Sequence, residues 1–269
     1  MNWTQGLAIV ALGAAAGLAG PGLALAQAPA GAGAPAAGPA LAPATVAMAA
    51  AVSAMPNQPA KMTFFVSSTG LGDGGNLGGL AGADAHCAKL ARAAGAPASR
   101  VWRAYLSQAL MNGMPQIDAR DRIGKGPWFN AKGVEIAANV EELHGLNPKM
   151  TKQTNLTELG KINNGGPASG DKPAMHDILT GSGKDGRLKS PEVADAREGA
   201  PKLPLPPNMT CNNWTSNDHQ LSTEVGHSDR DGFVPDAKSF NAAHPSRGCD
   251  QAGLVSTGGV GQIYCFAAS

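Results

Sequence analysis

The sequence predicts an α+β domain that is rich in loops and held together by disulfide bonds, and three observations favour this fold class. Short strand-like runs and one helix-like run are spread over the chain after residue 62. The stretches between them lack a hydrophobic period and contain many of the 36 glycines and 20 prolines. Four cysteines lie in the same region, and an even number of cysteines is typical of a disulfide-bonded exported domain.

The N-terminal part of the chain predicts a targeting segment followed by a tether. Residues 7–20 are apolar but too short and too rich in Ala and Gly to span a bilayer well, and Ala-Leu-Ala at 24–26 is a signal-peptidase pattern. We therefore expect a signal peptide at 1–26, or a membrane anchor if this segment stays uncleaved. Residues 27–61 are mostly Ala, Pro and Gly and predict a disordered tether, which leaves 62–269 as the folded domain.

The bulk charge and the Gly-rich loop exclude nucleic acid and nucleotides as partners. The formal net charge is +1, so no extended basic surface is expected. Gly70, Gly72 and Gly75 spell G-x-G-x-x-G, but no acidic residue follows at the distance that a dinucleotide fold requires, and no P-loop lysine is present. The loop instead predicts a tight turn with positive φ angles.

One helix is clear from its periodicity. Leu80, Ala83, Cys87 and Leu90 follow the spacing of one helical face, and Gly95 is a suitable stop. Cys87 therefore points at a core, which suits a structural disulfide better than a reactive thiol.

The other expected elements are short. Alternation and turn residues predict strands, and Asn139 is a good N-cap for a short helix at 139–145. Two stretches without a period, 146–175 and 183–209, predict long loops. The predicted strands are 63–68, 101–107, the hairpin pair 126–130 and 134–137, 176–182, 211–216 and 262–267.

A series of motifs in one order then resembles a known family. The chain reads GNLGGLAGADAHCAKLA, WRAYLS, GPW, CNNWTS, RGCDQ and a terminal IYCFA, and this series is similar to the bacterial lectin-like, endostatin-like exported proteins. The resemblance implies a C-type-lectin-like fold over 62–269, with two short antiparallel sheets and one or two flanking helices. It also implies the disulfides Cys87–Cys265 and Cys211–Cys249, and a core that contains Trp102 and Trp214.

The same resemblance implies a binding module rather than an enzyme. We expect a secreted, periplasmic or cell-surface protein that presents loops to an extracellular ligand, with a glycan as the first choice and a host or matrix protein as the second. The tripeptides through which calcium-dependent lectins bind sugar are absent from this chain. The expected ligand-binding residues are instead Trp128, Asn217 and Asp218. No sequence motif of a hydrolase is present. A purely structural envelope protein is an alternative.

Histidines near the C-terminal strands are the strongest candidates for chemistry. His176, His227, Asp229 and His244 are residue types that bind zinc, and we predict a possible zinc or calcium site from them. A metal-dependent hydrolase could use the same four residues, but it would need an open metal position and a cleft. The alternative is that these side chains only hydrogen-bond loop backbones. The remaining histidines are expected at the surface: His86, His144 and His219.

Overall fold

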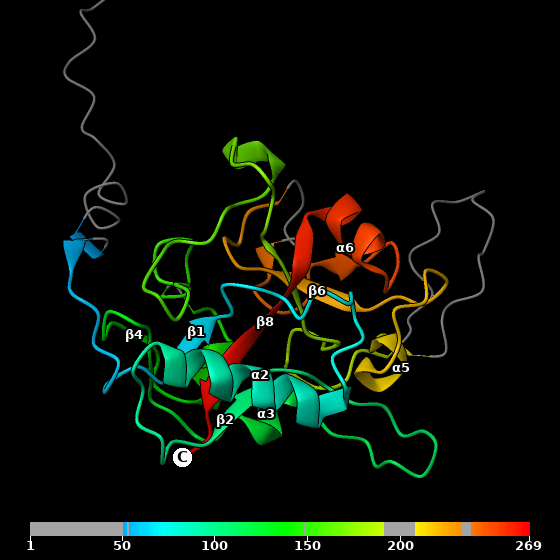
Figure 1. Cartoon of the computed structure of the whole chain (residues 1–269), viewed down its shortest axis with the longest axis horizontal. Coiled ribbons are helices and arrows are strands. Elements are labelled where there is room, and N and C mark those ends of the chain that lie inside the picture. The colour runs from blue at the N-terminus through cyan, green and yellow to red at the C-terminus, as the bar shows by residue number, and fades with distance from the viewer. Residues whose placement is uncertain (1–50, 53, 148, 191–207, 233–237) are drawn as a thin grey trace, which may run out of the picture. The chain divides into compact units, whose positions relative to one another are not determined.

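The computed structural model describes residues 51–52, 54–147, 149–190, 208–232 and 238–269 (Figure 1). The chain divides into a unit at 1–41 and a unit at 42–269, and every element described below belongs to the second. The predicted signal peptide and residues 27–50 of the predicted tether lie outside the described residues. Among the helices of the described ranges, none is both long and apolar enough to cross a bilayer.

The structure is of the α+β class and is built on one large sheet. The strand order is β1-β8-β5-β6-β7, and β2 also pairs with β8. A second, two-stranded sheet joins β3 and β4, and short helices lie in the connections. The strands are β1 Phe64–Val66, β2 Trp102–Ala104, β3 Trp128–Phe129, β4 Glu135–Ala137, β5 Asp177–Leu179, β6 Glu224–His227, β7 His244–Pro245 and β8 Gly259–Ala267. The helices are α2 Gly79–Ala93, α3 Ala119–Arg122, α4 Val140–His144, the 3-10 turn η1 Pro167–Ser169, α5 Cys211–Trp214 and α6 Gln251–Thr257.

The last strand, β8, supplies both hydrophobic cores. Successive side chains of a strand point to opposite faces, so Ile263 and Cys265 enter one core while Tyr264 and Phe266 enter the other. Figure 1 shows β8 as the long red arrow next to β1, with which it pairs. All four side chains are fully buried, which makes β8 the central strand of the domain.

Helix α2 packs on the first core and is linked to it covalently. Ala83, Cys87 and Ala91 are buried on the predicted face, and Cys87 forms a disulfide with Cys265 of β8. The second disulfide joins Cys211 to Cys249. Both pairings implied by the family resemblance are therefore present, and Trp102 and Trp214 lie in the same core as expected.

Local sequence signals placed several smaller elements correctly. The β3–β4 hairpin follows its predicted turn, and the Asn139 carboxamide accepts a hydrogen bond from the Glu142 N–H at the start of α4. Helix α6 was not predicted, although the Asp250 carboxylate caps it by accepting from the Gly253 N–H.

Two expectations about the sheets and strands were wrong. The large sheet is mixed rather than antiparallel, because β5 runs parallel to β8 while the other pairs are antiparallel. A parallel pair needs a long crossover, and the chain between Leu179 and Gly259 provides one. The second error concerns residues 211–216, which were predicted as a strand.

Residues 211–214 form a left-handed turn instead of a strand. Cys211, Asn212, Asn213 and Trp214 have φ angles of 47°, 56°, 56° and 65°. Such angles are costly for residues other than Gly, so tertiary contacts must hold them. The Asn213 carboxamide accepts from the Ala109 N–H and donates to the Ala109 carbonyl, and the Trp214 indole N–H donates to the Ser107 carbonyl.

The Gly-rich loop has a packing role. Gly72 and Gly74 have φ angles of 88° and 58°, which confirms the predicted turn. A Cβ atom on Gly74 would collide with the Cys249 carbonyl, and one on Gly75 with the Cys211 sulfur. The loop therefore lies directly against the Cys211–Cys249 disulfide, where a side chain would not fit.

The folded part begins earlier than the predicted boundary at residue 62. The Gln58 N–H donates to the Ala131 carbonyl at 2.7 Å, and the Lys132 ammonium donates to the Met55 carbonyl at 2.5 Å. These backbone groups are satisfied by the domain itself, so the end of the predicted tether is packed rather than disordered.

The two disulfides are expected to contribute unequally to stability. They close loops with sequence separations of 178 and 38 residues. Chain entropy alone gives about 5 kcal/mol for the longer loop and about 4 kcal/mol for the shorter one. Urea unfolding of Cys87→Ala/Cys265→Ala and of Cys211→Ala/Cys249→Ala should therefore show the larger loss in the first variant. A larger loss in the second would mean that the packing against the Gly-rich loop outweighs chain entropy.

Candidate metal centre

Four side chains meet where β5, β6 and β7 lie side by side. His176 precedes β5, Asp177 begins it, His227 ends β6 and His244 begins β7. Asp177 lies directly opposite His227 in the antiparallel pair, so their side chains share one face of the sheet. His244 lies opposite Val225, two residues before His227, and therefore belongs to the same face. The strand register thus gathers residues that are far apart in the sequence.

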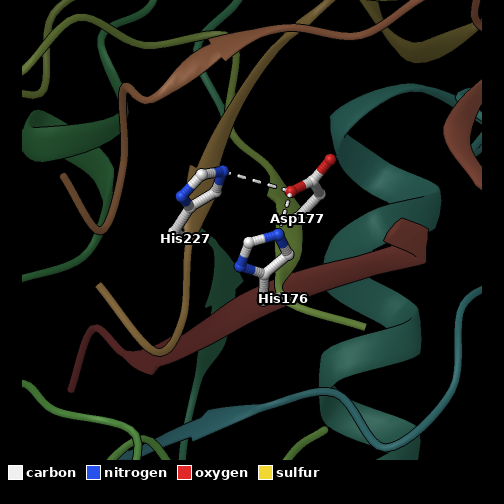
Figure 2. A group of neighbouring side chains, drawn as sticks. All are labelled: His176, Asp177 and His227. Carbon is white, nitrogen blue, oxygen red and sulfur yellow. Dashed lines mark ion pairs between the residues drawn. The ribbon is translucent and has the colours of Figure 1, made fainter. Parts of the chain in front are cut away.

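The Nε2 atoms of the three histidines converge on one oxygen of Asp177. The distances to Asp177 Oδ1 are 3.2 Å from His176, 3.3 Å from His227 and 3.7 Å from His244. His227 Nε2 and His244 Nε2 lie 2.9 Å apart. Figure 2 shows His176 and His227 with their nitrogens directed at Asp177, and these two rings stack with centroids 4.0 Å apart.

The Nδ1 atom of each ring is engaged on the other side by an acceptor. His176 Nδ1 lies 3.0 Å from Asp229 Oδ1, and His227 Nδ1 lies 2.6 Å from the Asp231 carbonyl. His244 Nδ1 lies 3.0 Å from the carbonyl of Pro245. A carbonyl or an ionised carboxylate can only accept, so each Nδ1 carries the proton. In the neutral imidazoles, every Nε2 therefore presents a lone pair to the centre.

The neutral site therefore contains several hydrogen-bond acceptors, the Nε2 atoms and the Asp177 oxygens, but no hydrogen-bond donor that faces them. Two Nε2 lone pairs face each other across 2.9 Å, and both carboxylate oxygens of Asp177 are buried without a hydrogen-bond partner. A buried unpaired carboxylate is strongly unfavourable, so the site requires a cation. Burial acts to lower the pKa of His227, but Asp177 and the Asp231 carbonyl outweigh it and raise the pKa above its ordinary value. A proton is thus one cation that the site attracts.

Three glycines leave the space that the ligand side chains occupy. A Cβ atom on Gly166 would collide with the His176 ring, and one on Gly258 would lie 3.1 Å from His176 Nε2. A Cβ on Gly259 would lie 3.0 Å from the Asp177 Cβ. Backbone alone therefore surrounds His176 and Asp177 on these sides.

The centre is buried except on one side. The side chains of His176, Asp177 and His227 are 7%, 2% and 5% exposed, whereas that of His244 is 33% exposed. An open pocket of about 390 Å³ lies nearby, and its walls include Asp229 but none of the four converging residues. Its lining residues are Leu146, Asn147, Met150, Thr151, Asp229 and Arg230.

The predicted metal residues are placed partly as expected. The structure brings His176, His227 and His244 together, but Asp229 lies behind the His176 ring, where it accepts from Nδ1 and from the Gly166 N–H at 2.8 Å. Asp177 takes the position that was predicted for Asp229. The signal that could have identified Asp177 is its position next to His176 at the start of a predicted strand, but the pairing with His227 is not visible in the sequence.

The three predicted ligand-binding residues differ in their exposure. Trp128 was expected at the surface but is buried, because its ring packs edge-on against Phe266 and its N–H donates to the Ala267 carbonyl. Asn217 and Asp218 are exposed, and the Asn217 carboxamide donates to Asp73. Trp128 therefore has no face to offer to a sugar.

The other three histidines have separate structural partners. His219 is exposed and pairs with Asp250 at 2.9 Å, and His86 lies 2.9 Å from the Thr69 carbonyl. His144 was expected at the surface but is largely enclosed, with its Nε2 2.7 Å from the Tyr105 hydroxyl. Burial lowers the pKa of His144 below its ordinary value, so the ring is neutral at pH 7.

Comparison with known proteins adds no family to this description. No protein-family model matches the chain, and no curated protein matches it significantly. The geometry of the site is therefore the main indication of what the domain does.

Asp229 is expected to support the metal affinity of the centre through its charge. An Asn at this position can still accept from His176 Nδ1 but no longer carries the negative charge that makes the ring a better donor. Asp229→Asn should weaken zinc binding by about 10- to 100-fold, measured by competition with a chromophoric chelator. Asp121→Asn, on an exposed residue of α3, is the matched control and should leave the affinity unchanged.

The same variant should change the acid stability of the metal-free protein. Burial acts to raise the pKa of Asp229, but hydrogen bonds from His176 and from the Gly166 and Asp231 N–H groups lower it from 3.8 to about 2. A lowered folded-state pKa stabilises the protein above the unfolded value and loses this effect as the pH falls. The stability difference between wild type and Asp229→Asn should therefore be full near neutral pH and shrink between pH 3.8 and about 2. A stability difference that stays constant over this pH range would mean that the ionised Asp229 carboxylate does not stabilise the fold.

Proposed function

We propose that this domain binds a divalent transition-metal ion, zinc in the first place, through His176, Asp177, His227 and His244. The observation that carries the proposal is the convergence of three Nε2 atoms on the buried Asp177 carboxylate, which has no hydrogen-bond donor while the three imidazoles are neutral. Hydrogen bonds to loop backbones explain the contacts of the Nδ1 atoms of His227 and His244. They do not explain why the Nε2 atoms of all three histidines face Asp177.

The separations between the donor atoms support a tetrahedral centre. With metal–ligand distances of 2.0–2.1 Å, neighbouring donors of a tetrahedral zinc site lie about 3.3–3.4 Å apart. Four of the six separations between the donor atoms are 3.2, 3.3, 3.7 and 2.9 Å, and they scatter around that value. Within the described residues, the donor atoms of His176, Asp177 and His227 all lie within 4.8 Å of one another. His244 is not part of this group, although its Nε2 is close to His227 and Asp177, so its ring would have to move to become the fourth ligand.

The chemistry of the donor set favours zinc over calcium. Calcium takes six to eight oxygen ligands, whereas this site offers three nitrogens and one carboxylate. Imidazole also binds copper and nickel, but those ions prefer tetragonal arrangements of donors. Of the two ions considered from the sequence, zinc is therefore the one that these residues suit.

The proposed centre would add a further link between strands that already pair through backbone hydrogen bonds. It connects β5, β6 and β7, and through Asp229 and Gly166 it reaches the loop before η1. Four protein ligands fill a tetrahedral shell, which is typical of structural zinc sites rather than catalytic ones. We therefore propose a metal-stabilised exported domain and not a hydrolase.

The predicted role as a lectin-like binding module is a separate proposal. Within it, a protein ligand now becomes a better choice than a glycan. Sugars are usually bound by stacking on exposed aromatic rings. In the described ranges, the exposed large apolar side chains are all aliphatic: Leu71, Val101, Leu110, Leu146, Leu159, Ile162 and Val255. The described residues therefore offer no exposed aromatic ring of this kind for a glycan, which leaves a protein ligand as the better choice within this proposal.

Purified oxidised protein without a His tag should contain one zinc ion per chain by mass spectrometry. Asp177→Asn should abolish this stoichiometry, whereas the exposed control Asp121→Asn should retain it. His227→Ala and the exposed control His219→Ala form a second matched pair. Loss of zinc in both members of a pair, or in neither, would contradict the site.

Metal binding should also appear as stability. Zinc at a free concentration of 100 times its dissociation constant adds about 2.7 kcal/mol to the unfolding free energy. For a domain of this size, this raises the Tm by about 5–10 °C, which calorimetry with and without a chelator can measure.

The metal-free form of Asp177→Asn provides an independent test. At a pH above the raised pKa of His227, it should be at least as stable as metal-free wild type, because the substitution removes a buried charge that then has no donor. A clear loss of stability would mean that Asp177 has a purely structural role.

A further inference from the structure

We infer that His244 is the exchangeable ligand of this centre, and that a small carboxylic acid from solvent takes its place on the metal. The inference rests on the proposed metal site and adds an external ligand to it. It follows from differences among the four donors in burial, in distance and in the support of each ring.

The first difference is access to solvent. The side chain of His244 is 33% exposed, whereas those of the other three donors are at most 7% exposed. Any molecule that reaches the metal from outside therefore meets His244 first. Its Nε2 atom is also the farthest from Asp177 Oδ1, at 3.7 Å compared with 3.2 and 3.3 Å.

The second difference is how firmly each ring is held. His176 is fixed by the side chain of Asp229, which is itself only 3% exposed, and His227 by the Asp231 carbonyl at 2.6 Å. On its Nδ1 side, His244 contacts only the carbonyl of its own neighbour, Pro245, at 3.0 Å. Ligand orientation in metal sites depends on such outer hydrogen bonds, so His244 is the least constrained donor.

The third difference is the element that carries the ring. His244 lies on β7, a two-residue strand at the edge of the sheet that pairs with β6 alone. In contrast, β5 lies between β8 and β6. Short edge elements open locally at lower free energy than central strands, so His244 can swing away while the other three donors stay in place.

Charge and size define the incoming ligand. With His244 displaced, a divalent ion held by two neutral imidazoles and the Asp177 carboxylate has a formal charge of about +1 together with these ligands, which favours an anionic donor. The further negative charge of Asp229 lies on the far side of the His176 ring, away from the vacated position. The space released is that of one imidazole ring, so a carboxylate on a small acid fits. In this exchange the bond between the metal and His244 Nε2 breaks and a bond between the metal and a carboxylate oxygen forms. The number of ligands stays at four, and no bond within the acid is broken.

The test uses Co²⁺ in place of zinc, because its visible spectrum reports the coordination number. Wild type, His244→Ala and the surface control His219→Ala are loaded with Co²⁺ and titrated with acetate at constant ionic strength, with acetamide as the uncharged comparison. We expect acetate to shift the bands of wild type and of the control equally, with the intensity typical of four-coordinate cobalt retained. Acetamide should have little effect.

The His244→Ala variant separates exchange from simple addition. In wild type, acetate must compete with the histidine, so its apparent affinity equals its intrinsic affinity multiplied by the fraction of time that His244 is off the metal. Acetate should therefore bind His244→Ala at least about 10-fold more tightly. A wild-type spectrum that does not respond to acetate, or a strong loss of intensity that indicates a fifth ligand, would overturn the inference. Failure of wild type to bind one Co²⁺ would instead refute the metal site itself.

Discussion

The burial of β8 is the constraint on which the rest of the structure depends. This strand pairs with β1, β2 and β5, and its alternating side chains enter both hydrophobic cores. Because Cys265 also joins α2 through a disulfide, the helix cannot move independently of the sheet. The parallel pairing of β8 with β5 then fixes where Asp177 lies, and the β5–β6 register brings His227 opposite to it.

Features that depend on nearby residues were predictable from the sequence. Strand β1, helix α2, the β3–β4 hairpin and the Asn139 cap of α4 each follow from a local pattern, and the structure contains them. The left-handed turn at 211–214 was not predictable, because it is held by the distant residues Ser107 and Ala109. The mixed sheet was missed for a similar reason, since no local pattern tells which strands will pair in parallel.

The candidate centre shows the same division between residue types and geometry. The sequence indicated three of the four converging residues, because histidines near short strands are natural metal ligands. It could not distinguish an inner carboxylate from an outer one. Asp177 faces the Nε2 atoms and Asp229 faces the Nδ1 side of His176, and this difference arises only from the strand register and the loop at 228–231.

The glycines around His176 and Asp177 have a consequence for recognising this centre in other chains. A search for the four ligand residues alone would accept sequences in which a side chain at position 166, 258 or 259 fills the space of the His176 ring or crowds Asp177. Such a chain would keep every donor type and still lack the geometry. The signature of the centre is therefore three histidines and an aspartate together with the glycines at 166, 258 and 259, so that the positions without side chains are as diagnostic as the ligands.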